Sequence, residues 1–249
     1  MDHDELGNAY VTAPDRTVRL GYLPEGRDDA LWKIAAYPNP FGPPHWVTTF
    51  SDTTPTEIVT GFTSALAEKY AQGRGGYLQE SRQVRDGYAP LAAAGWTMHS
   101  TFDYVEVTAP DEQAGLVYHR GRTDHMAELF GQQEKWTVWG GPEGYRSRWY
   151  GTHSTYTPVS LIAATTAAMA DASPVVRSRA EVPDQCWGLV EATPLEPPTP
   201  PAPTPLDVRR AQAARARSTA SAPSPSTLCY TSSTRQPGQS SSHLPNRRR

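Results

Sequence analysis

An internal repeat is the feature that most restricts how this chain can fold. Residues 11–15 read Val-Thr-Ala-Pro-Asp, and the same five residues recur at 107–111. A five-residue identity by chance has odds on the order of 1% in a chain of this length. Further identities follow in the same order, with an offset that grows from 96 to 103–104 residues. They are Leu20 with Leu116, Tyr22 with Tyr118, Trp32 with Trp136, Trp46 with Trp149, Thr54-Pro55 with Thr157-Pro158, and Ala65 with Ala168.

The growing offset places a short insertion in the second copy, around residues 124–134. Each copy has about 60–75 residues, which is small for a self-sufficient hydrophobic core. We therefore predict a duplicated body whose two copies pack against each other.

The first copy has the pattern of strands followed by one helix. Residues 17–23, 30–37 and 45–50 are rich in β-branched and aromatic residues and alternate in polarity, which predicts strands. Thr54-Pro55-Thr56-Glu57 reads as a capping box with Pro at the first helical position, and an apolar stripe continues to about Tyr70. This order predicts an antiparallel sheet covered by a helix.

The second copy repeats that order. Residues 116–119, 135–139 and 148–153 read as strands, and Thr157-Pro158 opens a helix in which Ser160 replaces the capping-box Glu. We predict an α+β fold with an internal duplication, each copy comprising three to four antiparallel strands followed by one helix.

The predicted organisation has five parts. The first repeat spans 8–72, a linker with a short Ala-rich helical turn spans 73–95, and the second repeat spans 96–172. Residues 173–205 hold a last strand at 186–190 and then a Pro-rich spacer. Residues 206–249 are predicted to be a disordered basic tail with a nascent helix at 207–217. The change of character after Ser218 fits either a native low-complexity end or a frameshifted one.

The net charge of the chain changes sign at the start of the predicted tail. Residues 207–249 contain eight Arg, one Asp and no Lys, a net charge of +7, whereas residues 1–206 carry −10. An acidic body argues against a nucleic-acid surface there, because neutralising phosphates requires clustered Lys and Arg. We expect an unknown protein partner for the body. The tail could add weak, non-specific nucleic-acid binding.

The repeated pattern resembles a known family. Each copy has a strand ending in Ala-Pro-Asp, a Trp-containing strand, a Pro-rich or variable loop, a second Trp strand, and Thr-Pro opening an apolar helix. This resembles the actinobacterial domain of unknown function 317, also called the SPDY domain, in two tandem copies. The first copy matches best, through Leu23-Pro24-Glu25, Trp32-Lys33 and Trp46, and the second lacks the Leu-Pro-Glu step. The family has no established activity, so the resemblance implies no catalytic residues.

The residues themselves do not point to catalysis. The chain lacks a nucleophile elbow, a Walker loop, a dinucleotide fingerprint and a His-Glu-x-x-His motif, so we predict no catalytic residues and no cofactor. Asp124, His125, His119 and Glu128 are the best metal-like group, but their loose spacing favours a polar insertion loop, and no metal site is predicted.

Three other residues were weighed as candidates. His153 has no histidine counterpart in the first copy, so we predict a structural role for it. Asp15 and Asp111 follow Pro in both copies. They form a motif of unknown role whose simplest interpretation is a turn in which the carboxylate accepts a backbone N–H.

One strip mixes aromatic residues with arginine. Such interleaving is typical of a surface that stacks bases or binds a partner. The repeated Trp136 and Trp149 are predicted to fill the core instead, as Trp32 and Trp46 do in the first copy. The candidate binding residues are therefore Trp139, Tyr145, Arg146, Arg148 and Tyr150.

These observations favour a non-enzymatic binding or regulatory protein. An acidic N-terminal segment without an apolar core leads us to expect a cytoplasmic location. Two alternatives stay open. One is a small hydrolase or transferase with its site in the cleft between the repeats, and the other is a structural or vestigial paralogue.

Overall fold

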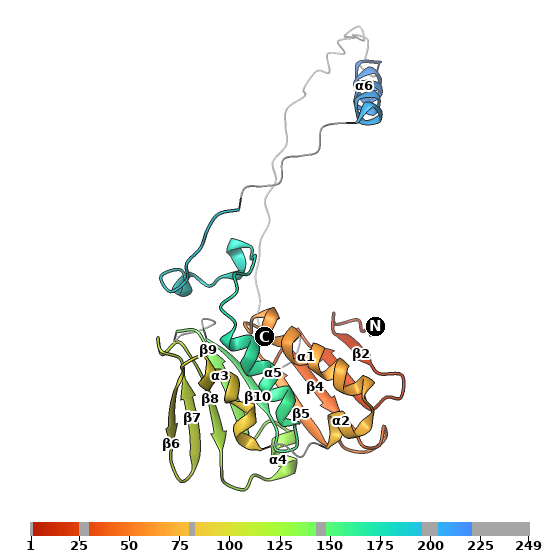
Figure 1. Cartoon of the computed structure of the whole chain (residues 1–249). Helices are drawn as coiled ribbons and strands as arrows, with labels where there is room; N and C mark the ends of the chain where they lie inside the picture. The colour runs from red at the N-terminus through yellow and green to blue at the C-terminus, as the bar shows by residue number, and fades with distance from the viewer. Residues whose placement is uncertain (1, 25–29, 80–82, 143–147, 196–203, 221–249) are drawn as a thin grey trace, which may run out of the picture. The chain divides into compact units, whose positions relative to one another are not determined.

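The computed structural model describes residues 2–24, 30–79, 83–142, 148–195 and 204–220, and for 216–220 it describes the backbone only (Figure 1). The chain divides into two units, Met1–Ala192 and Thr193–Arg249. The first unit holds both repeats, so its fold positions the candidate site.

A ten-stranded antiparallel sheet forms the first unit. Its strands lie in the order β1-β2-β3-β4-β5-β10-β9-β8-β7-β6, so each repeat supplies one half and the halves meet at β5 and β10. The strands are β1 (Asp2–His3), β2 (Ala9–Thr12), β3 (Val18–Tyr22), β4 (Trp32–Ala36), β5 (Trp46–Phe50), β6 (Thr97–Ser100), β7 (Tyr104–Thr108), β8 (Ala114–His119), β9 (Trp136–Gly140) and β10 (Trp149–His153). The predicted α+β duplication is confirmed, with Trp32 and Trp136 opening β4 and β9, and Trp46 and Trp149 opening β5 and β10.

The seam between the repeats has an approximate two-fold symmetry. Thr49 pairs with Thr152, its own repeat equivalent at an offset of 103, and their hydroxyls lie 2.8 Å apart. On one side of this pair the Tyr150 N–H donates to Ser51 Oγ at 3.0 Å, and on the other the Val47 N–H donates to Ser154 Oγ at 3.0 Å. Equivalent residues therefore make equivalent bonds, as at an interface between two copies of one subunit.

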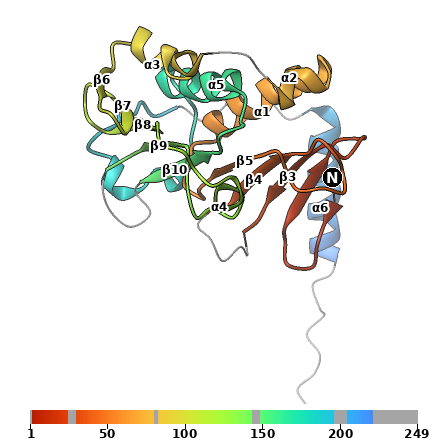
Figure 2. The same cartoon turned by 90° about the horizontal axis from the view of Figure 1, so that it is seen from below.

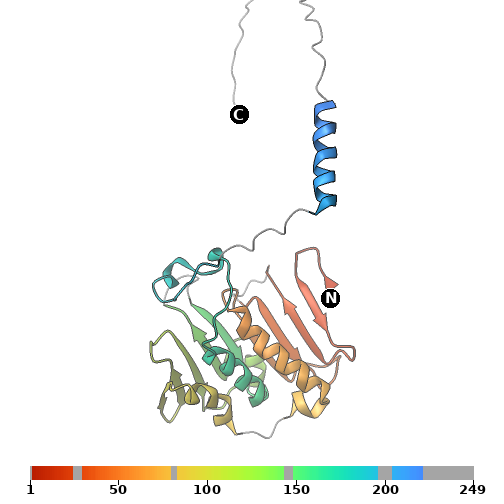
Figure 3. The same cartoon turned by 45° about the horizontal axis from the view of Figure 1, so that its top comes forward.

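Helices cover one face of the sheet (Figures 1 and 2). The two repeat helices, α1 (Thr56–Ala71) and α5 (Val159–Ala170), lie side by side across the seam (Figure 3). Small residues permit this approach, because a Cβ added to Gly61 would come within 3.0 Å of Ala168 Cβ. Short helices in the linker, α2 (Arg74–Leu78), η1 (Val84–Gly87) and α3 (Ala89–Ala93), join them.

The hydrophobic core fills the space between this face and the helices. Ile34, Trp46, Phe50 and Phe62 are fully buried in the first repeat. A second cluster lies in the second repeat, with Leu91, Val107, Leu116, Trp136, Val138 and Ile162. The apolar helical stripes read from the sequence thus face the sheet.

The predicted capping box is wrong. Helix α1 begins after Pro55 with no side-chain cap, and the Thr54 hydroxyl donates instead to the Tyr150 carbonyl of the other repeat at 3.2 Å. Glu57 forms an ion pair with Arg177. Thr54 of the Thr-Pro pair therefore contacts the other repeat across the seam. No local sequence pattern can reveal such a contact.

The predicted strand at 186–190 is also wrong. The segment after α5 contains two short 3-10 helices, η2 (Arg179–Glu181) and η3 (Asp184–Cys186), followed by turns. The sheet already ends at β1 and β6, and residues 186–190 pair with neither edge strand.

The second unit contains α6 (Pro205–Ala220), where only a nascent helix in a disordered tail was predicted. Its start has the reciprocal capping bonds that were misassigned to α1. The Asp207 N–H donates to Thr204 Oγ1 at 3.2 Å, and the Thr204 N–H donates to Asp207 Oδ2 at 3.1 Å. The Ala- and Arg-rich residues that follow are strong helix formers. The rest of the predicted tail, 221–249, lies outside the described residues.

Candidate functional site

The face of the sheet opposite the helices carries the candidate site. One row of register partners crosses all ten strands on this open face, and it is mostly polar. From edge to edge the row is Asp2, Tyr10, Gly21, Lys33, Thr49, Thr152, Thr137, Val117, Glu106 and His99. Although residues 1–206 are strongly acidic, the charges in this row nearly balance.

Three of the predicted binding residues come together on the second repeat's half of this face. Trp139 on β9 pairs with Tyr150 on β10, and the Arg148 guanidinium lies over both rings, 3.9 Å from the centroid of Trp139 and 5.7 Å from that of Tyr150. Tyr150 is 46% exposed. We call Trp139, Arg148 and Tyr150 the aromatic–arginine patch. Tyr145 and Arg146 lie outside the described residues.

The indole of Trp139 is held on two sides. Its neighbour Gly115 on β8 passes so close that an added Cβ would lie 2.6 Å from the indole. Arg148 stacks against the ring at cation–π distance. A base could not stack on the surface that Arg148 covers, so this arrangement is less suited to single-stranded nucleic acid than the sequence suggested.

A groove of about 650 Å³ adjoins the patch. Its walls include Trp139, Arg148, Thr97, Thr108 and Glu106. Glu112 also lines the groove, which thus combines one guanidinium, two carboxylates, hydroxyls and an indole. Such a surface offers hydrogen-bond donors, hydrogen-bond acceptors and apolar contact. Its lining lacks the cluster of Lys and Arg that phosphate binding requires.

The equivalent positions of the first repeat are small and covered. By the repeat offsets, Ala35 corresponds to Trp139 and Val47 to Tyr150. Leu129 of α4 (His125–Leu129) packs on Ala35 and Val47, and all three are less than 9% exposed. Helix α4 belongs to the insertion of the second repeat, so that repeat covers part of its neighbour's open face, whereas no helix of the described residues covers its own (Figure 2).

Buried hydrogen bonds hold α4 in place. Asp124 caps the helix, accepting from the Met126 and Ala127 N–H groups. The buried Glu128 carboxylate accepts from Thr123 Oγ1 at 2.5 Å, from the Thr155 N–H at 3.0 Å and from Thr155 Oγ1 at 2.6 Å. Glu128 therefore anchors the insertion to the segment after β10.

An aromatic cluster sits beside this anchor. The Tyr156 ring stacks on His45 at 4.8 Å and meets the edge of His125 at 5.0 Å. Burial and the nearby positive charge of His125 lower the pKa of His45. Within the described ranges, no group of three or more His, Cys, Asp or Glu side chains could hold a metal ion.

His153 lies in the core at the seam. It is fully buried, its Nδ1 is 3.0 Å from Thr48 Oγ1, and its ring stacks on Phe62 at 5.6 Å. Burial lowers the pKa of His153 to about 3, so the ring is neutral near pH 7. By offset it replaces Phe50, which occupies the same place in the first repeat and also contacts Phe62.

The comparison with protein families matches this geometry. The family model for SPDY, described as a domain of unknown function (DUF317), matches residues 12–72 and 108–175, one segment in each half of the sheet. The chain belongs to the SPDY family. No curated protein and no solved structure matches it.

Each SPDY repeat begins with the Ala-Pro-Asp turn. Asp15 Oδ1 accepts from the Thr17 N–H at 3.1 Å and from its hydroxyl at 2.7 Å, and Asp111 Oδ1 accepts from the Gln113 N–H at 3.0 Å. The residue after each Asp has a left-handed φ of 59°. The short aspartate side chain thus shapes the tight turn that leads into the next strand of both SPDY repeats.

The sequence did not predict two features of the surfaces described for this SPDY protein. Helix α4 covers the first repeat because the insertion is long enough to reach it. The shift in repeat offset revealed the insertion, but it did not show where the inserted residues pack. The groove beside Trp149, described below, depends on the conformation of residues 173–181. Within the described part of the chain, no helix is long and apolar enough to cross a bilayer.

Proposed function

We propose that this SPDY protein is a non-catalytic, cytosolic binding protein, and that a partner protein docks on the aromatic–arginine patch of the second repeat. One observation carries the proposal. Equivalent positions are small and covered by Leu129 in one repeat, whereas in the other they are aromatic, with Arg148 stacked on Trp139 and Tyr150 46% exposed. Trp, Tyr and Arg are the residue types that dominate the energetics of protein interfaces.

The chemistry of the groove suggests what the partner presents. A partner segment with an apolar side chain would pack on Tyr150 and the edge of Trp139. A carboxylate on the same segment would pair with the Arg148 guanidinium, whose stacked geometry reduces the entropy lost on binding. Glu106 and Glu112 in the groove wall would select against a uniformly acidic segment.

The Arg-rich C-terminal part has a separate role in this proposal. Helix α6 carries Arg209, Arg210 and Arg215 on exposed positions. They would give weak, salt-sensitive attraction to nucleic acid, independent of the sheet. The enzyme alternative placed its site between the repeats, where β5 and β10 are paired and the buried His153 is neutral. A groove lies between α1 and α5 on the helix-bearing side.

The test is a set of affinity captures from native lysate with matched baits, each run with and without nuclease. The baits are the parent, Trp139→Ala, Arg148→Glu and the control Lys33→Glu, which places a charge reversal on the open face of the first repeat. We expect a protein retained by the parent and by Lys33→Glu, resistant to nuclease, and reduced at least tenfold by both patch variants.

Two results would contradict the proposal. One is capture that survives both patch variants, which would move the interface elsewhere. The other is capture abolished by nuclease and by removal of residues 206–249, which would make the tail and nucleic acid responsible. Circular dichroism of each bait would show that the variants are folded.

A further inference from the structure

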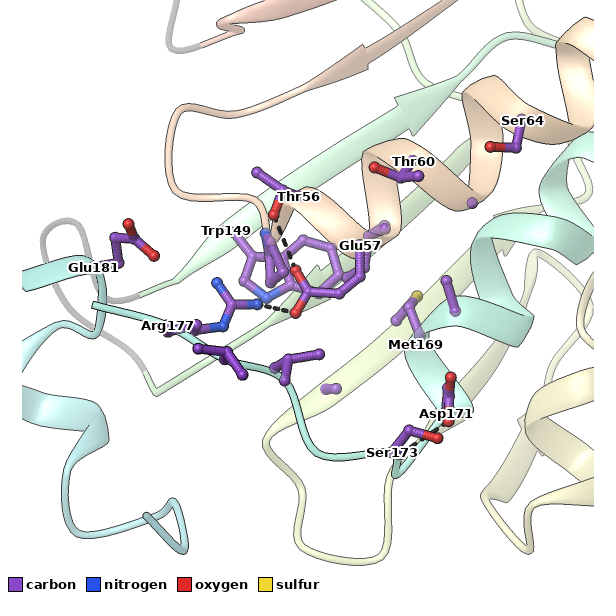
Figure 4. Close-up of a pocket in the computed structure, with 17 residues that line it drawn as sticks. Thr56, Glu57, Thr60, Ser64, Trp149, Met169, Asp171, Ser173, Arg177 and Glu181 are labelled. Carbon is purple, nitrogen blue, oxygen red and sulfur yellow. Dashed lines mark hydrogen bonds and ion pairs between the residues drawn. The ribbon is translucent and has the colours of Figure 1, made fainter. Parts of the chain in front are cut away.

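A second groove lies on the helix-bearing side of the sheet. It has a volume of about 770 Å³, within the range of small-molecule sites. It is bordered by the first turns of α1, the end of α5, and residues 173–181, which we call the strap (Figure 4). The half-buried indole of Trp149 forms one wall.

The equivalent space in the first repeat is filled. Trp46, the counterpart of Trp149, is fully buried, and its Nε1 donates to the Tyr77 carbonyl at 2.7 Å. Tyr77 on α2 is 1% exposed, its hydroxyl lies 2.7 Å from Thr17 Oγ1, and its ring packs beside Tyr70. Tyr77 thus completes the core beside the first repeat's tryptophan, held by one hydrogen bond at its hydroxyl and another at its backbone carbonyl.

The second repeat has no such residue. By the same offset Tyr70 corresponds to Ser173, and the strap, Ser173–Glu181, contains no aromatic residue. Where α2 packs into the first repeat, the strap runs along the rim with Val175 and Val176 more than half exposed. The counterpart of the Tyr77 space therefore stays open, with the tryptophan on its wall.

The groove is acidic. Glu57 pairs with Arg177 at the rim, and Asp171 and Glu181 add two more carboxylates (Figure 4). Hydrogen bonds from Ser173 lower the pKa of Asp171, which keeps this carboxylate ionised at neutral pH. Carboxylates beside an indole attract a positive charge and disfavour an anion.

We propose that this groove is a binding site for a small aromatic amine. Its ring occupies the space beside Trp149 that corresponds to the place of Tyr77 in the first repeat's core, and its ammonium group faces the Asp171 carboxylate. The site is on the opposite side of the sheet from the aromatic–arginine patch, so it does not depend on the function proposed above.

Tyramine and 4-hydroxyphenylacetate test the proposal, because they share a phenol ring and differ in the sign of the terminal charge. Saturation-transfer NMR and calorimetry on the full chain would give both affinities. We expect tyramine to bind at least tenfold more tightly than the acid, with a preference that weakens as salt is added.

Two variants probe the groove without altering the core. Ser173→Tyr introduces, in the wall of the groove, the aromatic residue that the first repeat has at Tyr70, and should reduce tyramine binding at least tenfold by narrowing the site. Asp171→Asn should reduce it severalfold, whereas the control Glu68→Gln, at the equivalent exposed position of α1, should leave it unchanged.

Three results would each overturn the assignment. They are absence of tyramine binding to the parent, equal affinity for the two phenols, and tyramine binding that Ser173→Tyr leaves intact. Equal affinity would indicate apolar contact without charge recognition. Persistent binding in Ser173→Tyr would place the amine elsewhere on the acidic body.

Discussion

Over Trp46 the first repeat packs Tyr77 of the linker, whereas the second repeat leaves Trp149 beside an open groove. On the other face, Leu129 covers Ala35 and Val47 of the first repeat, while in the second repeat Trp139 is half-buried beneath Arg148 and Tyr150 is exposed. At both of these places the first repeat is covered, whereas among the described residues the second repeat leaves a groove or an exposed ring. Both proposed binding surfaces consequently lie in the second repeat.

The difference between the two repeats arises in the segments that connect their strands and helices. The β-strands and the main helix of each repeat correspond, and the seam bonds are related by the approximate two-fold axis. The insertion that forms α4 and the linker that forms α2 occur once each. In a duplicated protein, single-copy segments can close one half and leave the equivalent surface of the other half available for a partner.

The largest expected effect is a difference in stability between equivalent substitutions in the cores under α1 and α5. Phe62 is fully buried between Trp46, Phe50 and His153, and its counterpart by offset is Thr165. Phe62→Ala should lower the free energy of unfolding by about 3–5 kcal/mol because it leaves a large cavity. Thr165→Ala should cost only about 1 kcal/mol, mainly through its hydroxyl bond to the Leu161 carbonyl. Urea denaturation of both variants measures this, and equal losses would show that the helices are packed alike.

Low pH should destabilise the fold through His153, on the second repeat's side of the seam. Because burial lowers the pKa of His153 from 6.5 to about 3, the unfolded chain binds a proton in this window that the folded chain does not. Stability should therefore fall as the pH drops below about 6.5, by up to about 1.4 kcal/mol per unit.

The variant His153→Phe, which installs the first repeat's residue, should flatten this dependence. A smaller slope of the same sign should remain from His45, whose pKa is also lowered. Denaturation midpoints between pH 4.5 and 7.5 test this, and an unchanged slope in the variant would assign the acid sensitivity to other groups.

The two equivalent tryptophans should respond unequally to loss of the indole N–H. Trp46→Phe leaves the buried Tyr77 carbonyl without its donor and should cost about 1–3 kcal/mol. Trp149→Phe, at the half-buried wall of the groove, should cost less than about 0.5 kcal/mol. If thermal or urea unfolding shows the reverse order, the second repeat is the more tightly closed of the two.

The repeated turn offers a finer comparison. Burial opposes ionisation of Asp15, but hydrogen bonds from Thr17 and Tyr70 outweigh it and lower the pKa of Asp15. Asp15→Ala should cost about 1 kcal/mol, and Asp111→Ala about half as much, since the exposed Asp111 carboxylate accepts the Gln113 N–H without the hydroxyl bond that Thr17 adds. Equal losses in denaturation experiments would mean that the backbone bond alone matters.

The smallest effect concerns the tail. Deleting residues 206–249 should shift the thermal midpoint of the repeats by less than about 1 °C, because the described side chains of α6 are exposed and the Ser-, Pro- and Arg-rich sequence cannot bury enough apolar surface. A loss of several degrees in a calorimetric scan would show that the tail stabilises the folded repeats.

Much of the architecture could be read from residue patterns. The identities from Val11 to Ala65 and their counterparts predicted the duplication, three to four strands of each repeat and its main helix, because each repeat unit has its own alternation and turn signals. They did not predict that β5 and β10 join the halves into one sheet. Trp139, Arg148 and Tyr150 stood out as candidates because they lack equivalents in the first copy. The seam contact of Thr54, the anchor at Glu128 and the buried His153 gave no local signal, since each depends on partners far away in the chain.

The sequence by itself therefore determined that there are two copies, which elements each contains, and which residues differ between them. Only the tertiary structure decided which surfaces are closed. That outcome depends on where α4 and α2 pack, and their packing is set by long-range burial of Leu129 and Tyr77. Local periodicity encodes the conformation of a segment and the side it buries. Which other segment covers that side follows from the free energy of contacts between distant residues.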